Sequence, residues 1–177
     1  MRYNISQNDG NSIDDSRYFL MNNTADGLQI YDNDVYTYTK TTGLVQDSTD
    51  YSYTTQPIFE NNLVFNQSPN GVCYINTKGS NPWFVDYNDL YGYGSCKLEG
   101  EQTHAISGNP DFTSPPAGAG RNSASTAYTL TQNSPAFCQG AEQGDPILSN
   151  GGIDFAGTPL PSGAVDAGAL EKGDNIC

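Results

Sequence analysis

The segment that decides the fold occurs three times, as Ile30-Tyr-Asp-Asn33-Asp-Val35-Tyr, Ile58-Phe-Glu-Asn61-Asn-Leu63-Val and Val85-Asp-Tyr-Asn88-Asp-Leu90-Tyr. In each copy an Asn stands two positions before an aliphatic residue, and the three Asn residues are 28 and then 27 positions apart. The copies are rich in β-branched and aromatic residues, which is typical of strands. A β sequence that repeats at a fixed period without helices predicts a β-solenoid, in which successive coils stack on one another.

Two further features extend this repeat. A degenerate first copy, Arg2-Tyr3-Asn4-Ile5-Ser, has Tyr3 in the position of the Asn, and Gly43 and Gly71 each follow an Asn of the repeat by ten positions. We therefore expect about four coils, each with a strand, a Gly turn and another strand. In this register Val35, Leu63 and Leu90 form an inward column, and the Asn side chains hydrogen-bond to one another at the bends. An antiparallel β-sandwich is the alternative.

The composition of the 177 residues excludes several classes of protein. A net charge of −13 argues against nucleic acid and anionic membranes as partners, because both require clustered Lys and Arg. No apolar run approaches the roughly 20 residues of a membrane span. Ala, Leu, Glu and Lys are scarce, so a helical bundle is not expected. The length fits one domain, or one domain with a small appendage.

Four motifs follow in order in the last third of the chain: Asn109-Pro-Asp-Phe112, Tyr128-Thr-Leu-Thr-Gln-Asn-Ser-Pro-Ala136, Asp154-Phe-Ala-Gly-Thr-Pro159 and Asp166-Ala-Gly-Ala-Leu-Glu171. They match D-P-x-F, Y-x-L-x-x-x-S-P-A, D-x-x-G-x-P and D-x-G-A-x-E, except that Asn109 replaces the usual Asp. With the coil-like segments, they make the chain resemble right-handed parallel β-helix proteins of the pectate-lyase-like superfamily. The motifs are similar to the C-terminal segment of secreted members.

This resemblance implies a fold and a setting. The fold is a right-handed, single-stranded parallel β-helix over residues 1–104, followed by an irregular crossing and capping segment over residues 105–177 that folds over the last coil. The setting is extracellular and involves carbohydrate. No counterpart of the cap precedes the first strand, so we expect the chain to be the C-terminal portion of a longer protein, or its N-terminal end to be covered by another chain. The superfamily includes lyases, hydrolases, epimerases and adhesins, so the resemblance does not imply one reaction.

The cysteines and sequons agree with an extracellular protein. Four cysteines without a C-x-x-C pair favour two disulfides over a zinc site, and the single histidine, His104, has no partner at ligand spacing. Three pairings are possible, of which Cys73–Cys96 with Cys138–Cys177 keeps each bond within one region of the chain. Asn4 and Asn22 begin acceptor sequons for glycosylation.

Acidic residues of the repeat are the candidate catalytic and metal-binding groups. If residues alternate between the two faces of each strand, Asp32, Asp34 and Glu60 lie on the solvent face, about 5 to 7 Å apart. Paired carboxylates at such separations act on glycosidic bonds. The same oxygens, with those of Asp89, are suitable ligands for Ca²⁺. The alternative is a solvated acidic face without a function.

Aromatic residues of the repeat are candidates for stacking on sugar rings. These residues are Tyr31, Tyr36, Trp83, Tyr87 and Tyr91. The alternative is that they pack inside the coils. His104 is interpreted as a linker residue.

The resemblance therefore implies a secreted polysaccharide-binding or polysaccharide-processing protein, of lyase or glycosidase type if it is an enzyme. A chain this acidic repels a polyuronate unless a metal bridges the two. The alternative function is a non-catalytic structural or adhesive module that self-associates through its open N-terminal coil.

Overall fold

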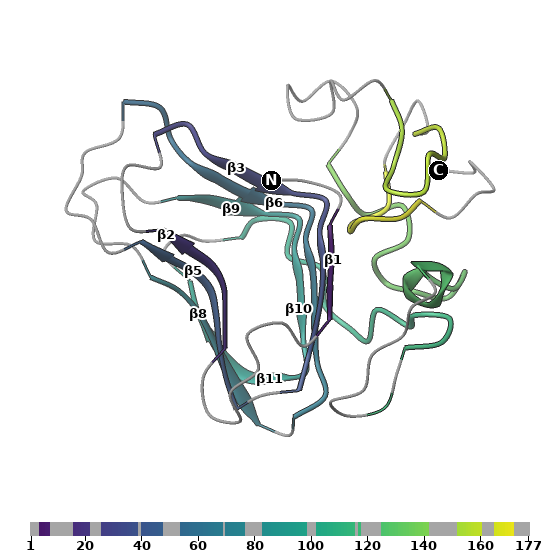
Figure 1. The fold of residues 1–177 in the computed structure, drawn as a ribbon, viewed down its shortest axis with the longest axis horizontal. Coiled ribbons are helices and arrows are strands. Elements are labelled where there is room, and N and C mark those ends of the chain that lie inside the picture. The colour runs from purple at the N-terminus through teal and green to yellow at the C-terminus, as the bar shows by residue number, and fades with distance from the viewer. Residues whose placement is uncertain are drawn as a thin grey trace.

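The computed structural model consists of three parallel β-sheets beside a C-terminal segment (within residues 105–177) whose described residues form few regular elements (Figure 1). Its described residues are 4–7, 16–21, 26–38, 40–47, 54–68, 70–76, 83–98, 102–115, 117, 125–141, 152–160 and 165–171. Within these ranges the one helix is the 3₁₀ helix η1 (Ser125–Tyr128), and no helix is long and apolar enough to cross a membrane. The prediction of an all-β chain is confirmed.

The strands form three sheets, which we name by their first strands. The β1 sheet contains, in order, β1 (Ile5–Gln7), β4 (Asp34–Thr37), β7 (Leu63–Asn66) and β10 (Asp89–Tyr91). The β2 sheet contains β2 (Ser16–Met21), β5 (Thr41–Asp47), β8 (Gly71–Asn76) and β11 (Tyr93–Lys97). The β3 sheet contains β3 (Gln29–Tyr31), β6 (Ile58–Glu60) and β9 (Phe84–Asp86).

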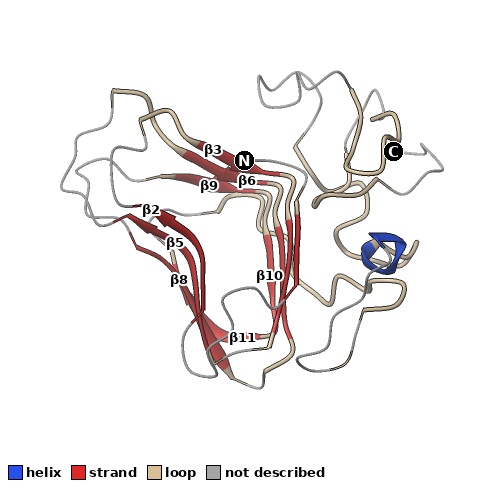
Figure 2. Cartoon of the chain, in the orientation of Figure 1, coloured by secondary structure: helices blue, strands red, loops and turns tan. Residues whose placement is uncertain are grey.

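Each successive run of three strands adds one strand to each sheet. The runs are β3-β4-β5, β6-β7-β8 and β9-β10-β11, and every pair of neighbouring strands is parallel (Figure 2). This order is compatible with a solenoid of stacked coils. The alternative of an antiparallel sandwich is wrong.

A sharp corner separates the first two strands of each run. Asp32, Asn61 and Tyr87 occupy this corner with φ angles of 51°, 55° and 52°. Asp and Asn tolerate this left-handed conformation better than other non-glycine residues, whereas Tyr rarely adopts it. Two of the three corners are thus built from suitable residues, and the third is not.

A ladder of side-chain amides follows the corner. Asn33 donates from Nδ2 to Oδ1 of Asn62 (2.8 Å), and Asn62 donates in the same way to Asn88 (2.9 Å). Asn4, which is also a predicted glycosylation acceptor, donates from Nδ2 to Asn33 (2.8 Å). The side chains of Asn33, Asn62 and Asn88 also donate to backbone carbonyls of the bend, for example Asn62 to the Glu60 carbonyl (2.9 Å). The ladder therefore supplies the hydrogen bonds that a tight turn would otherwise leave unmade.

The predicted register was wrong by one residue in the second copy and in the degenerate first copy. The tandem Asn61-Asn62 offers two candidates, and the structure uses Asn62 in the ladder and Asn61 at the corner. Asn4, not Tyr3, is the first Asn of the ladder. The two predicted turn glycines are also out of register, because Gly43 pairs with Tyr74 and not with Gly71.

The space between the three sheets is filled by apolar side chains. Val35 and Leu90 both pair with Val64, so Val64 replaces the predicted Leu63 in the inward column. Ile30, Phe59 and Val85 form a second column from the β3 sheet. Full burial of each such side chain contributes about 2 kcal/mol relative to its exposed state.

One predicted disulfide is present. Cys73 of β8 and Cys96 of β11 are bonded, with a Cα–Cα distance of 4.4 Å, and their strands pair directly. The bond is typical of proteins from oxidising compartments. The second predicted pair includes Cys177, and the second predicted sequon includes Asn22. Both of these residues lie outside the described residues.

The C-terminal segment packs against the outer face of the β1 sheet, on the side away from the other two sheets (Figure 1). Leu63, Tyr36 and Phe65 point to this face and form an outer apolar cluster with residues of the segment: Phe112, Ala127, Tyr128, Leu130, Ala136, Ala167 and Leu170. The sequence predicted a lid over the last coil. The described residues of the segment cover the outer face of the β1 sheet, because that face exposes large apolar side chains, and Ile106 also pairs with Asp89 of the last run.

Candidate functional site

The predicted catalytic carboxylates are not on a solvent face. Asp32, Asp34 and Glu60 are all buried, with 2%, 1% and 1% of their surface exposed. For Asp34, the prediction of a solvent face failed because the C-terminal segment covers it: the Ala169 amide donates to Oδ1 of Asp34 (3.1 Å). A substrate therefore has no access to Asp34 in this arrangement.

Asp89 lies in the same column of the β1 sheet as Asp34 and is buried to the same extent. Among the described residues, neither carboxylate oxygen of Asp89 has a hydrogen-bond partner. Burial raises the pKa of Asp89 to about 8 and holds the pKa of Asp34 well above its usual range. These two side chains are thus best described as buried, protonated acids.

The predicted Ca²⁺ ligands are Asp32, Asp34, Glu60 and Asp89. In the part of the chain that the structure describes, no three His, Cys, Asp or Glu side chains are placed to hold a metal ion. The structure therefore does not bring these four carboxylates together as the predicted Ca²⁺ site.

The candidate sugar-stacking residues divide into two groups. Tyr31, Tyr36 and Trp83 are buried, with at most 6% of their surface exposed. Trp83 packs in the core between the three sheets, as the alternative interpretation stated, whereas Tyr36 lies in the outer apolar cluster. Tyr91 is 37% exposed and stacks on Phe65, with ring centroids 5.6 Å apart. Tyr87 is partly exposed and lies at the corner of the last run. Two of the five aromatic residues therefore remain accessible.

Residues 102–106 return to this corner and stack on it. The side-chain oxygen of Gln102 accepts from the backbone amide and the side chain of Asn88 (3.0 and 3.1 Å). Gln102 thus continues the ladder of side-chain amides by one step. Ile106 then pairs with Asp89 in a parallel bridge. Between these two contacts the chain carries His104 across the end of β9.

His104 forms a pair with Asp86, the last residue of β9. Nδ1 of His104 lies 2.9 Å from Oδ2 of Asp86, and the His104 amide donates to Oδ1 (2.7 Å). The Tyr87 amide also donates to Oδ1 (3.0 Å) and the Thr103 hydroxyl to Oδ2 (3.3 Å). Burial opposes ionisation of Asp86, but hydrogen bonds from His104 and Tyr87 and the proximity of the imidazole lower the pKa of Asp86 overall.

The imidazole of His104 stacks on the Tyr87 ring. The centroids are 4.5 Å apart and the planes are inclined by 13°. The Asp86 side chain is buried, whereas 58% of the His104 side chain is exposed. Tyr87 holds a backbone conformation that bulky residues rarely adopt, and such outliers concentrate at functional sites.

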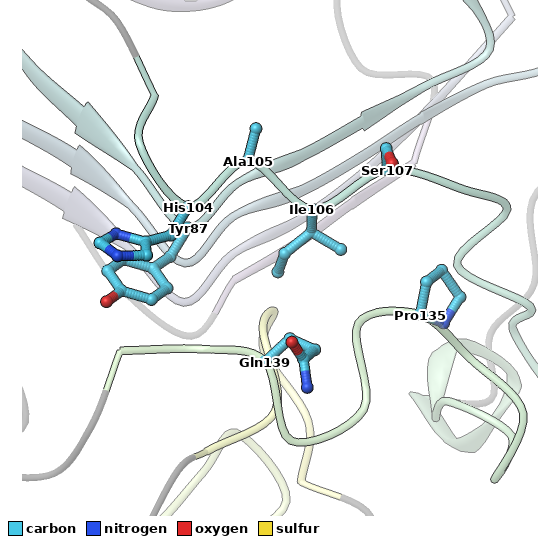
Figure 3. Close-up of a pocket in the computed structure, with 7 residues that line it drawn as sticks. All are labelled: Tyr87, His104, Ala105, Ile106, Ser107, Pro135 and Gln139. Carbon is cyan, nitrogen blue, oxygen red and sulfur yellow. The ribbon is translucent and has the colours of Figure 1, made fainter.

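A cleft of about 310 Å³ opens beside this pair (Figure 3). Ile106 points into it from one wall, and Pro135 and Gln139 of the C-terminal segment form the other. The complete lining consists of Tyr87, His104, Ala105, Ile106, Ser107, Pro135 and Gln139. The cleft therefore combines an oriented imidazole, an aromatic ring, a hydroxyl and an amide.

From the sequence we predicted Tyr87 as a sugar-stacking residue and interpreted His104 as a linker residue, but we did not identify Asp86. Asp86 and His104 are 18 positions apart, with two complete strands, β10 and β11, between them. A signal was nevertheless present: Tyr87 stands where the other corners have Asp32 and Asn61, which marks this corner as different.

No protein-family model and no curated protein matches the chain.

Proposed function

We propose that the chain is a secreted, right-handed parallel β-helix protein of about four coils, and that it binds or processes a polysaccharide outside the cell through the cleft beside Tyr87 and His104. The observation that carries the proposal is the exposed, stacked Tyr87–His104 pair at the mouth of this cleft. Flat ring surfaces beside hydroxyl and amide groups are suited to the alternating apolar and polar faces of sugars.

The fold and the setting are supported by separate observations. The addition of one strand per sheet in each run supports stacked coils, and the motif residues Asp166 to Glu171 support the superfamily resemblance. The Cys73–Cys96 bond supports an oxidising compartment.

The net charge of −13 restricts the class of polysaccharide that we expect the chain to bind. An acidic protein repels polyuronates, so the polysaccharide that fits this chain is neutral.

Tyr87→Asn tests the site. Asn61 shows that Asn fits this corner, so the variant removes the ring while the backbone conformation is retained. We expect affinity for a neutral polysaccharide such as glucomannan, measured by affinity gel electrophoresis, to fall about fivefold, since one aromatic contact contributes about 1 kcal/mol. The matched control is Tyr38→Asn, at an exposed Tyr that does not line the cleft.

Unchanged affinity in Tyr87→Asn, or an equal loss in Tyr38→Asn, would contradict the proposed site. No binding to any member of a panel of neutral polysaccharides would contradict the function itself.

One observation favours the alternative of a self-associating module. β1, β2 and β3 are edge strands of their respective sheets, and they come from consecutive parts of the chain. Edge strands present backbone groups that can pair with another chain. Sedimentation velocity distinguishes the two functions: assembly that grows with protein concentration, without affinity for any polysaccharide, supports the module.

A further inference from the structure

We infer that Asp86 and His104 form a proton-transfer site, and that its reaction is the hydrolysis of an acyl ester carried by a neutral polysaccharide. The inference rests on the proposed function, because the same cleft must first hold the glycan. It assigns His104 as the catalytic residue and Asp86 as a positioning residue.

Asp86 determines which nitrogen of His104 carries the proton. The Asp86 carboxylate is buried and accepts from the backbone amides of His104 and Tyr87, so it is an acceptor toward Nδ1 as well. Nδ1 of a neutral imidazole must then be the protonated nitrogen, which leaves the lone pair on Nε2. Nε2 is therefore available as a base.

The ring is held in place and yet accessible. Its orientation is fixed on one edge by Asp86 (2.9 Å) and on one face by Tyr87 (4.5 Å between centroids). More than half of the His104 side chain is still exposed. A fixed imidazole with a free nitrogen beside a cleft is the arrangement that general acid–base catalysis requires.

The cleft wall beside His104 offers one donor for a developing negative charge, the hydroxyl of Ser107, which lines the cleft with His104. Gln139 lines the opposite wall, but its Nε2 donates to the Cys138 carbonyl (3.1 Å) and points away from Ile106, so its side-chain oxygen faces the cleft (Figure 3). A hydroxyl donor stabilises the oxyanion that forms when water adds to a carbonyl.

One imidazole is sufficient for both proton transfers of ester hydrolysis. Nε2 of His104 accepts a proton from water while the water oxygen bonds to the acyl carbon, which gives a tetrahedral intermediate. The bond between the acyl carbon and the sugar oxygen then breaks, and Nε2 returns the proton to that oxygen. The products are a carboxylic acid and a free sugar hydroxyl, and the imidazole is regenerated.

Two other reactions fit this site less well. Glycoside hydrolysis generally needs two carboxyl groups at the scissile bond, whereas Asp86 is buried and occupied by its four donors. A lyase reaction needs a uronate, which a chain of net charge −13 repels.

Acetate release from O-acetylated glucomannan tests the inference. We expect the wild-type protein to release acetate and His104→Gln to lose at least a hundredfold in rate, since a general base contributes about 10² to 10⁴. Affinity for the same polysaccharide without acetyl groups should change much less. The matched control is Asp26→Asn, at an exposed residue outside the cleft lining.

Asp86→Asn separates a positioning role from a merely structural one. Loss of the carboxylate removes the acceptor that fixes the proton on Nδ1 of His104, so the kcat for acetate release should fall while the KM is retained. Asp86→Glu, which keeps a carboxylate, should restore part of the rate, whereas a purely structural role of Asp86 predicts no rescue by Glu.

Binding of glucomannan without acetate release, or His104→Gln with wild-type release, would overturn this inference and leave the proposed function intact. The absence of both binding and release would overturn the proposed function as well.

Discussion

The pKa of a buried aspartate is raised on the outer face of the β1 sheet and lowered at the corner of the last run. Asp89 on the outer face is buried without a described hydrogen-bond partner, and its pKa rises to about 8. Asp86 at the corner is also buried, yet it accepts four hydrogen bonds and its pKa falls. The two residues are only three positions apart. Burial alone therefore does not set the charge of a carboxyl group; the donors around it do.

Packing of the C-terminal segment against the outer face is coupled to proton uptake, because it buries carboxyl groups. Glu171 accepts from the Asp166 amide (3.3 Å), but burial and the neighbouring Asp166 carboxyl raise the pKa of Glu171 to about 8. Backbone amides of the segment contact the face directly: Gly168 donates to the Asn61 carbonyl (2.8 Å) and Ala141 to its side-chain oxygen (2.8 Å). The segment thus covers acids that are most easily buried when protonated.

The largest expected effect is on the pH dependence of stability. Asp89 and Glu171 keep their protons in the folded chain up to about pH 8, but lose them near pH 4 when the chain unfolds, since the ordinary pKa values of Asp and Glu are 3.8 and 4.5. Folding therefore takes up protons, and the free energy of unfolding should be highest below about pH 4. We expect it to fall by roughly 4 to 5 kcal/mol for each of the two groups, about 9 kcal/mol in all, as the pH rises from 4 to 8. Urea unfolding at pH 4, 6 and 8 measures this, and constant or rising stability would contradict it.

The second prediction concerns the close approach of the segment to the face. A Cβ on Gly168 would contact Oδ1 of Asp34 and lie 2.8 Å from Cδ1 of Leu63, at a φ of +105°. We expect Gly168→Ala to lower the free energy of unfolding by about 3 kcal/mol through strain and overpacking. The control is Gly157→Ala: its φ is +86° but nothing lies within 4 Å, so only about 1 kcal/mol of backbone strain applies. Equal losses in urea unfolding would show that the contact has no effect.

The smallest expected effect is a difference in sign: the same Asp-to-Asn substitution should raise the free energy of unfolding at one position and lower it at the other. At pH 8, Asp89→Asn removes a group that opposes burial and should raise the free energy of unfolding by about 2 kcal/mol. Asp86→Asn leaves its donors without a charged acceptor and should lower it by about 2 kcal/mol. Thermal or urea unfolding of both variants at pH 8 tests the pair. Shifts of the same sign would mean that the two environments are alike.

The repeat made the fold predictable, but its register was ambiguous at one place. Parallel stacking follows from the regular spacing of Asn33 and Asn88. The tandem Asn61-Asn62 provided two equally good partners, and only the left-handed corner at Asn61 decides between them. A corner conformation is a property of the backbone, and Asn accepts it as readily as it accepts a ladder position.

The candidate site was predicted less well than the fold. Strand alternation correctly separates Val64 from Leu63, but it does not say what covers the outward residues. That covering turned Asp34 from an expected solvent group into a buried acid. His104 could not be paired with Asp86, because the contact depends on how the chain returns over the corner after β11.

The sequence by itself determined that this chain forms parallel strands with a ladder of Asn side chains between them, because Asn and aliphatic residues recur at a near-constant interval. It left open which of Asn61 and Asn62 joins the ladder and which of the cysteine pairings forms. Only the tertiary structure decided which face is covered, which carboxyl groups keep their protons and which aspartate meets the histidine. The reason is physical: strand formation depends on local residue preferences, whereas desolvation and hydrogen bonding depend on segments that are far apart in the chain and come together only on folding.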